Sequence, residues 1–148
     1  MQINTIDLLP GVRETIAGQL VSAYPNEGCG ALVGSVGADG AVKMTEAVGI
    51  PNVEPVRSQD RFTLDPRGYA ALEERLAASK DGSRIVGFFH SHPDGIAQPS
   101  KVDLEMAQGL YEFTRTHYLY AIQAITNDGA GELSFWKLSE SRDSFIAV

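Results

Sequence analysis

The chain has 148 residues, of which 43% are hydrophobic and 21% charged, and its formal net charge is −7. These values are ordinary for one globular domain spanning residues 1–148, which can fold without disulfides or a structural metal. One cysteine excludes a disulfide within the chain and suits a reducing cytoplasm. The acidic balance and the lack of a basic stripe argue against a nucleic-acid partner.

The sequence also argues against a membrane partner. No segment approaches the roughly 18 apolar residues that a membrane-spanning helix needs. Residues 1–10 lack the basic start and the apolar run of a signal peptide. We therefore expect a cytoplasmic protein.

The first half of the chain predicts helices separated by a β-hairpin. Val12, Ile16 and Leu20 recur at helical spacing, and Asp65 followed by Pro66 is a good N-cap and first-turn pair. The predicted elements are a helix over 10–24, strands over 29–35 and 41–50 joined by a turn over 37–40, a loop over 51–60, a short strand over 61–64, and a helix over 65–79.

The second half predicts a buried strand, a helix and a second hairpin. The predicted elements are a strand over 84–89 that runs into His90, a loop over 93–99, a helix from about Ser100, and strands over 118–126 and 132–138 joined by a turn over 127–129. Hairpins outnumber crossover units, so a doubly wound parallel sheet is disfavoured. The order predicts a mixed α/β domain with a sheet flanked by helices.

Two histidines and an aspartate have the spacing of a catalytic zinc site. His90 and His92 are two residues apart at the end of a strand, so both imidazoles point to the same side. Asp103 follows eleven residues later, in the first turn of the next helix. Two histidines and one carboxylate leave a fourth position for water, whose pKa zinc lowers to near 7. The same ligands can hold other divalent ions.

A hydrolase of this kind also needs a group that takes the proton of the attacking water and passes it to the leaving amine. A carboxylate that is not a metal ligand serves this purpose, and Glu27, at the start of the first long predicted strand, is the best candidate.

Each part of this pattern has a simpler interpretation. A His-x-His pair is often incidental, and Glu27 alone would be surface charge. Ser100 and Asp103 have the spacing of a helix capping box, a role that is compatible with metal binding because it fixes where the carboxylate lies. The combination is much more specific than any of its parts.

The combination resembles the JAMM motif of the JAB/MPN superfamily. The match consists of His90-x-His92, seven residues, then Ser100-x-x-Asp103, with Glu27 ahead of an apolar strand. Asn52, Arg61-Phe62 and Asp65-Pro66 resemble the linker and second-helix start of small prokaryotic members, so the resemblance covers residues 9–138.

The resemblance implies a fold, a cofactor and a role for each motif residue. The implied fold is the cytidine-deaminase-like JAB/MPN fold, with a largely antiparallel sheet flanked by helices. His90, His92 and Asp103 would bind one Zn²⁺ per chain, Glu27 would be the general acid/base, and Ser100 would stabilise the oxyanion of the tetrahedral intermediate.

The resemblance also implies a substrate class. The family uses zinc-bound water to cleave peptide or isopeptide bonds after the diglycine tail of ubiquitin-like proteins, and small bacterial members process ubiquitin-like sulfur carriers. The chain lacks the long insertion of polyubiquitin-specific members. We therefore expect the loop over 52–59 to contact the substrate tail, which would lie along it as an added strand.

Two other functions stay open at this stage. One is a catalytically silent MPN scaffold, although such relatives lose ligands that are present here. The other is a zinc hydrolase of a different amide substrate, because a fold and a metal do not determine the substrate. Cys29 shares a strand face with Glu27, and we expect it to be a buried, inert thiol.

Overall fold

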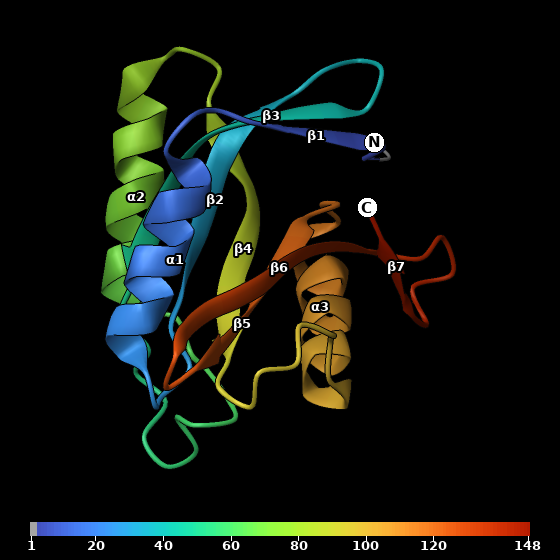
Figure 1. Cartoon of the computed structure of the whole chain (residues 1–148). Coiled ribbons are helices and arrows are strands. Elements are labelled where there is room, and N and C mark those ends of the chain that lie inside the picture. Colours follow the sequence, from blue (N-terminus) through green and yellow to red (C-terminus); the bar gives the residue numbers. More distant parts are fainter. Residues whose placement is uncertain (1–2) are drawn as a thin grey trace.

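The computed structural model describes residues 3–148, which form a seven-stranded sheet and three helices (Figure 1). The first two positions of the N-terminal segment considered above lie outside the described residues. The elements are β1 (Thr5–Leu8), α1 (Val12–Ala23), β2 (Cys29–Val36), β3 (Ala41–Ile50), α2 (Pro66–Ser79), β4 (Arg84–His92), α3 (Lys101–Thr114), β5 (Leu119–Thr126), β6 (Gly129–Leu138) and β7 (Phe145–Ala147).

The sheet is mostly antiparallel, as predicted. Its strand order is β1-β3-β2-β4-β5-β6-β7, and only the β1–β3 and β4–β5 pairs are parallel. The parallel β4–β5 pair requires a crossover connection, and α3 provides it. The mixed α/β class and the predominance of hairpins are therefore confirmed.

The helices cover both faces of the sheet and bury a separate core cluster on each side. On one face, Ile16 and Leu20 of α1 pack with Phe89 of β4 in the larger cluster. On the other face, Leu72 of α2 and Phe88 of β4 belong to the second cluster, against which α3 also packs. The predicted apolar stripe of the first helix is confirmed, since Val12, Ile16 and Leu20 are all buried.

Four differences from the sequence prediction concern the ends of elements and short strands. The first helix begins at Val12, with Gly11 as N-cap, two residues later than predicted. The predicted strand over 61–64 is wrong, because Leu64 forms only an isolated bridge with Asn52. The strands β1 and β7, which were not predicted, form the two edges of the sheet, and β6 begins at Gly129 rather than at Glu132.

A β-bulge in β4 determines which face its last residues occupy. Leu32 of β2 pairs with Gly87, whereas the next residue, Val33, pairs with Ile85, so β4 contains one extra residue. A bulge of this kind shifts the alternation of side chains beyond it. Phe88 consequently faces the α2–α3 side, and His90 and His92 follow it at the two-residue spacing of a strand.

In the part of the chain that the structure describes, every helix is too short or too polar to cross a bilayer.

Candidate metal centre

The side chains of His90, His92 and Asp103 converge at the end of β4. The Nε2 atoms of the two histidines lie 3.2 Å apart. The Asp103 carboxylate approaches both, with Oδ1 3.1 Å from His90 Nε2 and Oδ2 2.9 Å from His92 Nε2. One ligand atom from each residue lies within 4.8 Å of the others, and all three side chains are almost completely buried.

The start of α3 positions Asp103. Ser100 is the N-cap, and its Oγ accepts a hydrogen bond from the backbone N–H of Asp103 at 3.1 Å. In return, Asp103 Oδ2 accepts the backbone N–H of Ser100 at 2.8 Å. This reciprocal capping box was predicted from the spacing. It fixes the carboxylate against the two histidines, so Asp103 both caps the helix and belongs to the cluster.

The loop after β4 determines the tautomer of His92. The backbone oxygen of Ile96 lies 2.8 Å from His92 Nδ1. A carbonyl oxygen can only accept, so Nδ1 carries a hydrogen. When the ring is neutral, Nε2 presents its lone pair to the cluster, and when the ring is protonated, Nε2 donates to Asp103. Metal-binding histidines are commonly oriented by such an outer hydrogen bond.

The donor set of this cluster fits a divalent cation. Two imidazole nitrogens and a carboxylate that face one another are all electron donors when the histidines are neutral, and a cation stabilises such an arrangement. His90 Nε2 and His92 Nε2 point at the same carboxylate and at each other. With two nitrogens and one carboxylate, the cluster has the ligands of an open zinc site.

The electrostatics of the cluster couple its members. Burial opposes ionisation of Asp103, but hydrogen bonds from His90 and His92 hold the pKa of its carboxyl far below the usual range. Burial likewise disfavours a charged His92, yet its hydrogen bond with Asp103 raises the pKa of the imidazole overall. Asp103 is therefore ionised throughout the neutral pH range, as a metal ligand must be.

Glu27 does not belong to the ligand set of the cluster, but its carboxyl is near enough to His92 and Asp103 for their charges to act on it. The residue is 4% exposed, and its Oε1 has no hydrogen-bond partner within residues 3–148. Burial raises the pKa of the carboxyl from 4.5 to about 8, and the charge of His92 acts in the opposite direction. A buried carboxyl with an unpartnered oxygen and a pKa near neutrality has the properties of a proton-transfer group.

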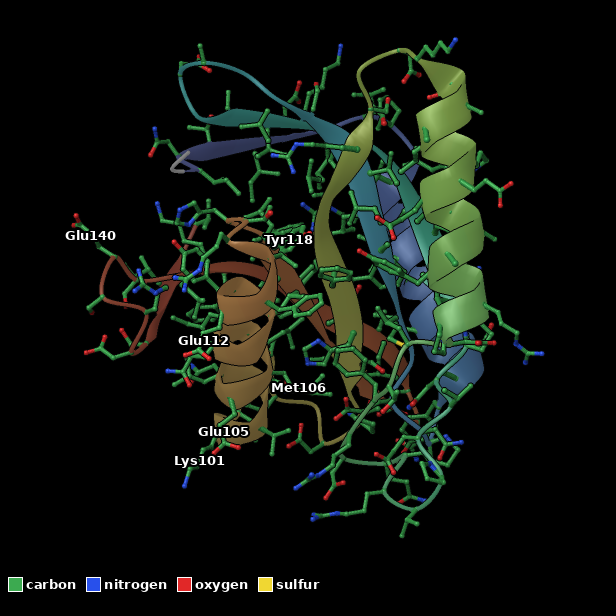
Figure 2. The ribbon with its side chains drawn as sticks, turned by 180° about the vertical axis from the view of Figure 1, so that it is seen from behind. Lys101, Glu105, Met106, Glu112, Tyr118 and Glu140 are labelled. Atoms are coloured by element: carbon green, nitrogen blue, oxygen red, sulfur yellow. The ribbon has the colours of Figure 1, made fainter. Side chains whose placement is uncertain are left out.

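An apolar cavity of about 460 Å³ opens at the cluster. His90 and Asp103 form its polar end, and the ring of Phe62 stacks on the His90 imidazole with centroids 4.7 Å apart. Figure 2 shows Met106 on the side of α3 that faces β4, whereas Lys101 and Glu112 point away. The other lining residues are Thr63, Leu64, Tyr69, Phe88, Glu105, Gly109, Leu110, Phe113, Tyr120, Ile122 and Phe145.

Two further predicted residues have clear surroundings. Ser100 is exposed at the start of α3, and within residues 3–148 its Oγ takes part only in the capping bond that it accepts, which leaves its O–H able to donate. Cys29 is buried, its thiol donates to Ile50 O at 3.3 Å, and burial raises its pKa to about 12. The expected burial of the thiol is therefore confirmed, and the raised pKa disfavours the reactive thiolate.

The sequence analysis gave no role to Ser91 and no position in the site to Phe62. Ser91 is completely buried, and its Oγ accepts the backbone N–H of Gly28, 63 residues away in sequence. The one sequence signal for Ser91 is its place between two histidines of one strand face, which directs it to the opposite face. Phe62 lies in a segment that the sequence predicts as a strand, and no pattern in the neighbouring sequence indicates that it stacks on His90.

Comparisons with known proteins agree on one family. The family model described as prokaryotic homologs of the JAB domain matches residues 10–139. A relative named desampylase, from Haloferax volcanii, is 30% identical over 141 residues, covering 95% of this chain and 88% of the relative.

Solved structures extend the comparison to the fold. A protein from Salinibacter ruber has a TM-score of 0.68 at 31% identity, covering 96% of this chain and 88% of that protein. A protein from Desulfitobacterium hafniense has a TM-score of 0.74 at 24% identity, covering 97% of this chain and 89% of that protein. At 24% identity, the second likeness bears on the fold alone.

Proposed function

Because the chain belongs to the family of prokaryotic homologs of the JAB domain, we propose that it is a zinc-dependent hydrolase of ubiquitin-like or sulfur-carrier proteins. It would cleave the peptide or isopeptide bond that follows the diglycine tail of such a protein. The observation that carries the proposal is the convergence of His90, His92 and Asp103 beside the buried, unpartnered carboxyl of Glu27.

The three clustered residues would hold the zinc through His90 Nε2, His92 Nε2 and the Asp103 carboxylate. When bound, the ion supplies a Lewis acid and a water molecule that is acidic enough to ionise near neutral pH. The chain's own contribution is a set of ligands that is already assembled. The capping box orients Asp103, and the Ile96 carbonyl orients His92.

Glu27 would move the proton. Hydrolysis of an amide adds the oxygen of water to the carbonyl carbon, breaks the C–N bond and delivers a proton to the leaving nitrogen. The buried Glu27 carboxylate accepts the proton of the attacking water and donates it to the nitrogen. Its pKa of about 8 in the metal-free protein supports this role, because a neighbouring cation lowers that value toward the working pH.

Ser100 would stabilise the negative oxygen that develops during the attack. Its Oγ is fixed by the capping bond from Asp103, and its O–H remains able to donate. A donor held in position before the reaction stabilises developing charge at little reorganisation cost.

The apolar cavity supports a polypeptide substrate. Most of its lining side chains are aromatic or aliphatic, and His90 and Asp103 are among its few polar ones. We propose that the tail of the ubiquitin-like protein occupies it, with apolar side chains near the diglycine in the cavity and the scissile carbonyl at the cluster. Phe62 and Leu64 place the end of the 52–64 segment in its wall, next to the loop expected to contact the substrate.

The relative named desampylase supports this substrate class, because its name denotes removal of a ubiquitin-like modifier. The match to it covers 95% of this chain. A catalytically silent scaffold would not need a buried proton-transfer carboxyl beside an intact ligand set.

The test is a cleavage assay with a ubiquitin-like sulfur carrier that extends beyond its diglycine. The intact mass of the carrier would be measured after incubation with zinc-loaded protein, with and without chelator. We expect chelator-sensitive loss of the residues after the diglycine. A carrier with both glycines replaced by bulkier residues serves as the matched control and should stay intact. An uncut carrier in the presence of one bound zinc would contradict the proposal.

A further inference from the structure

The carboxylate of Glu27 is not held in place by direct contacts. Within residues 3–148, its buried Oε1 has no hydrogen-bond partner, and the side chain as a whole is buried. The direction of the carboxyl is therefore determined by the packing around it and by the backbone from which it extends. This makes the hydrogen bonds of the Glu27 backbone relevant to proton transfer.

Two side chains hold the peptide unit between Glu27 and Gly28 from opposite ends. Asn52 Nδ2 donates to the carbonyl oxygen of Glu27 at 2.9 Å. The N–H of Gly28, at the other end of the same peptide, donates to Ser91 Oγ at 2.8 Å. Asn52 follows β3, whereas Ser91 lies in β4 between the two histidines, so the clamp joins three parts of the chain.

Backbone contacts hold the peptide units on either side of it. The N–H of Glu27 donates to the carbonyl of Ser58 at 2.6 Å, and the N–H of Ser91 donates to the carbonyl of Gly28 at 3.1 Å. Gly28 is also closely packed, since a Cβ built on it would lie 2.8 Å from Ala23 Cβ in α1. The peptide therefore has little room to move while both side-chain bonds persist.

Asn52 links this clamp to the loop at the cavity. Besides the bond to Glu27, Asn52 Nδ2 donates a second hydrogen bond, to Arg61 O at 3.1 Å. Asn52 Oδ1 accepts hydrogen bonds from the N–H groups of Glu54 and Thr63 at 3.0 and 2.9 Å. All four hydrogen-bonding positions of the amide are thus used. The same loop carries Phe62, which stacks on His90.

We infer that Asn52 and Ser91 are positioning residues, which clamp the Glu27–Gly28 peptide and thereby aim the Glu27 carboxyl at the metal cluster. The catalytic consequence rests on the proposed function, whereas the clamp itself does not. Because both side chains act on one peptide unit, loss of either releases it. Loss of the second then adds little, so the two substitutions should be strongly non-additive.

The test compares Asn52→Asp, Ser91→Ala and the double variant. Asn52→Asp retains an oxygen for the N–H groups of Glu54 and Thr63 but removes the donor to Glu27. Ser79→Ala is the matched control, because it removes the hydrogen bonds of a serine Oγ to Leu76 O and Asp81 Oδ1 at the end of α2, outside the cavity lining. Zinc affinity, kcat and KM would be measured for each on the extended carrier.

We expect each single variant to lower kcat by about 10–100-fold, the range typical for outer partners of metal sites. KM and zinc affinity should change by less than about threefold, and the double variant should be no worse than about threefold below the poorer single variant. Ser79→Ala should behave as the unmodified chain. Multiplicative effects, or a kcat loss that follows loss of zinc, would overturn the inference.

A second measurement does not depend on activity. In ¹⁵N-labelled zinc-loaded protein, exchange of the Gly28 amide hydrogen should accelerate at least about tenfold in Asn52→Asp and in Ser91→Ala, but not in Ser79→Ala. Unchanged Gly28 exchange in both variants would overturn the clamp. If the unmodified protein does not cut the carrier but exchange is faster in the variants, the clamp is supported and the proposed hydrolysis is rejected. If Ser91→Ala does not fold, Asn52→Asp alone decides both readouts.

Discussion

The two halves of the candidate site are held in different ways. The ligand half lies within residues 90–103, where His90 and His92 contact Asp103 directly at 3.1 and 2.9 Å. In the base half, the Glu27 carboxyl has no direct partner among the described residues, and distant segments hold its backbone. Metal binding is therefore organised by residues close in sequence, whereas proton transfer depends on contacts between distant segments. Substitutions should be able to remove one of these functions and leave the other.

Glu27→Gln should separate proton transfer from metal binding most clearly. The amide is nearly isosteric with the carboxyl but cannot shuttle a proton, so kcat should fall by about 10²–10⁴-fold. Zinc stoichiometry and affinity should be unchanged, because Glu27 is not one of the clustered ligands. Steady-state kinetics together with metal analysis checks both statements. Full activity in the variant would show that another group transfers the proton.

Asp103→Asn should break the ligand half. The amide can still accept the N–H of Ser100, so the helix cap and the fold should persist. The charge that faces both histidines is lost, and zinc affinity should fall by more than about 100-fold, beyond the effect of losing an outer partner. Competition with a chromogenic chelator measures this affinity. An unchanged affinity with one zinc per chain would exclude Asp103 as a ligand.

The same division explains what sequence reasoning could predict. His90, His92, Ser100 and Asp103 lie close together in the chain, and strand alternation with helix capping links them, so their convergence follows from local rules. The long elements were predictable for the same reason. The role of Glu27 depended on family resemblance, because nothing local to it distinguishes a buried base from surface charge.

The features that were missed depend on contacts between distant residues. Ser91 and Gly28 are 63 residues apart, and Asn52 is 25 residues from Glu27. The segment over 61–64 has the composition of a strand, yet the Asn52 side chain holds it and Phe62 packs on an imidazole. The strands β1 and β7 have four and three residues, too few for a periodic signal, and pairing with distant strands defines them.

Removal of zinc should test whether the metal also supports the fold. Both core clusters are formed by apolar side chains and include none of the ligands, so the chain should stay folded after chelation and unfold cooperatively. At zinc concentrations about 100-fold above Kd, binding adds only about 2.7 kcal/mol to the free energy of unfolding. Thermal unfolding followed by circular dichroism, with and without chelator, measures this. Unfolding on chelation at 25 °C would indicate a structural metal instead.

The smallest expected effect concerns pH and the stability of the metal-free protein. Burial raises the pKa of Glu27 from 4.5 to about 8, so between these values the folded chain holds a proton that the unfolded chain has released. Stability from this group is complete below pH 4.5 and is lost as the pH rises through 8. The free energy of unfolding then falls by up to about 1.4 kcal/mol per pH unit, or by about 2 kcal/mol between pH 6 and 7.5.

Denaturant unfolding of the metal-free protein and of Glu27→Gln at these two pH values isolates the contribution of Glu27. His92, whose pKa is also raised, partly by the charge of Glu27, adds a decrease of the same sign to both proteins, so the difference between them belongs to Glu27 and its coupling to His92. The decrease should be larger in the unmodified chain by about 2 kcal/mol, and equal decreases would reject a raised pKa. Zinc should reduce the difference, because a cation in the ligand half favours the Glu27 carboxylate. The halves are held separately, but charge couples them.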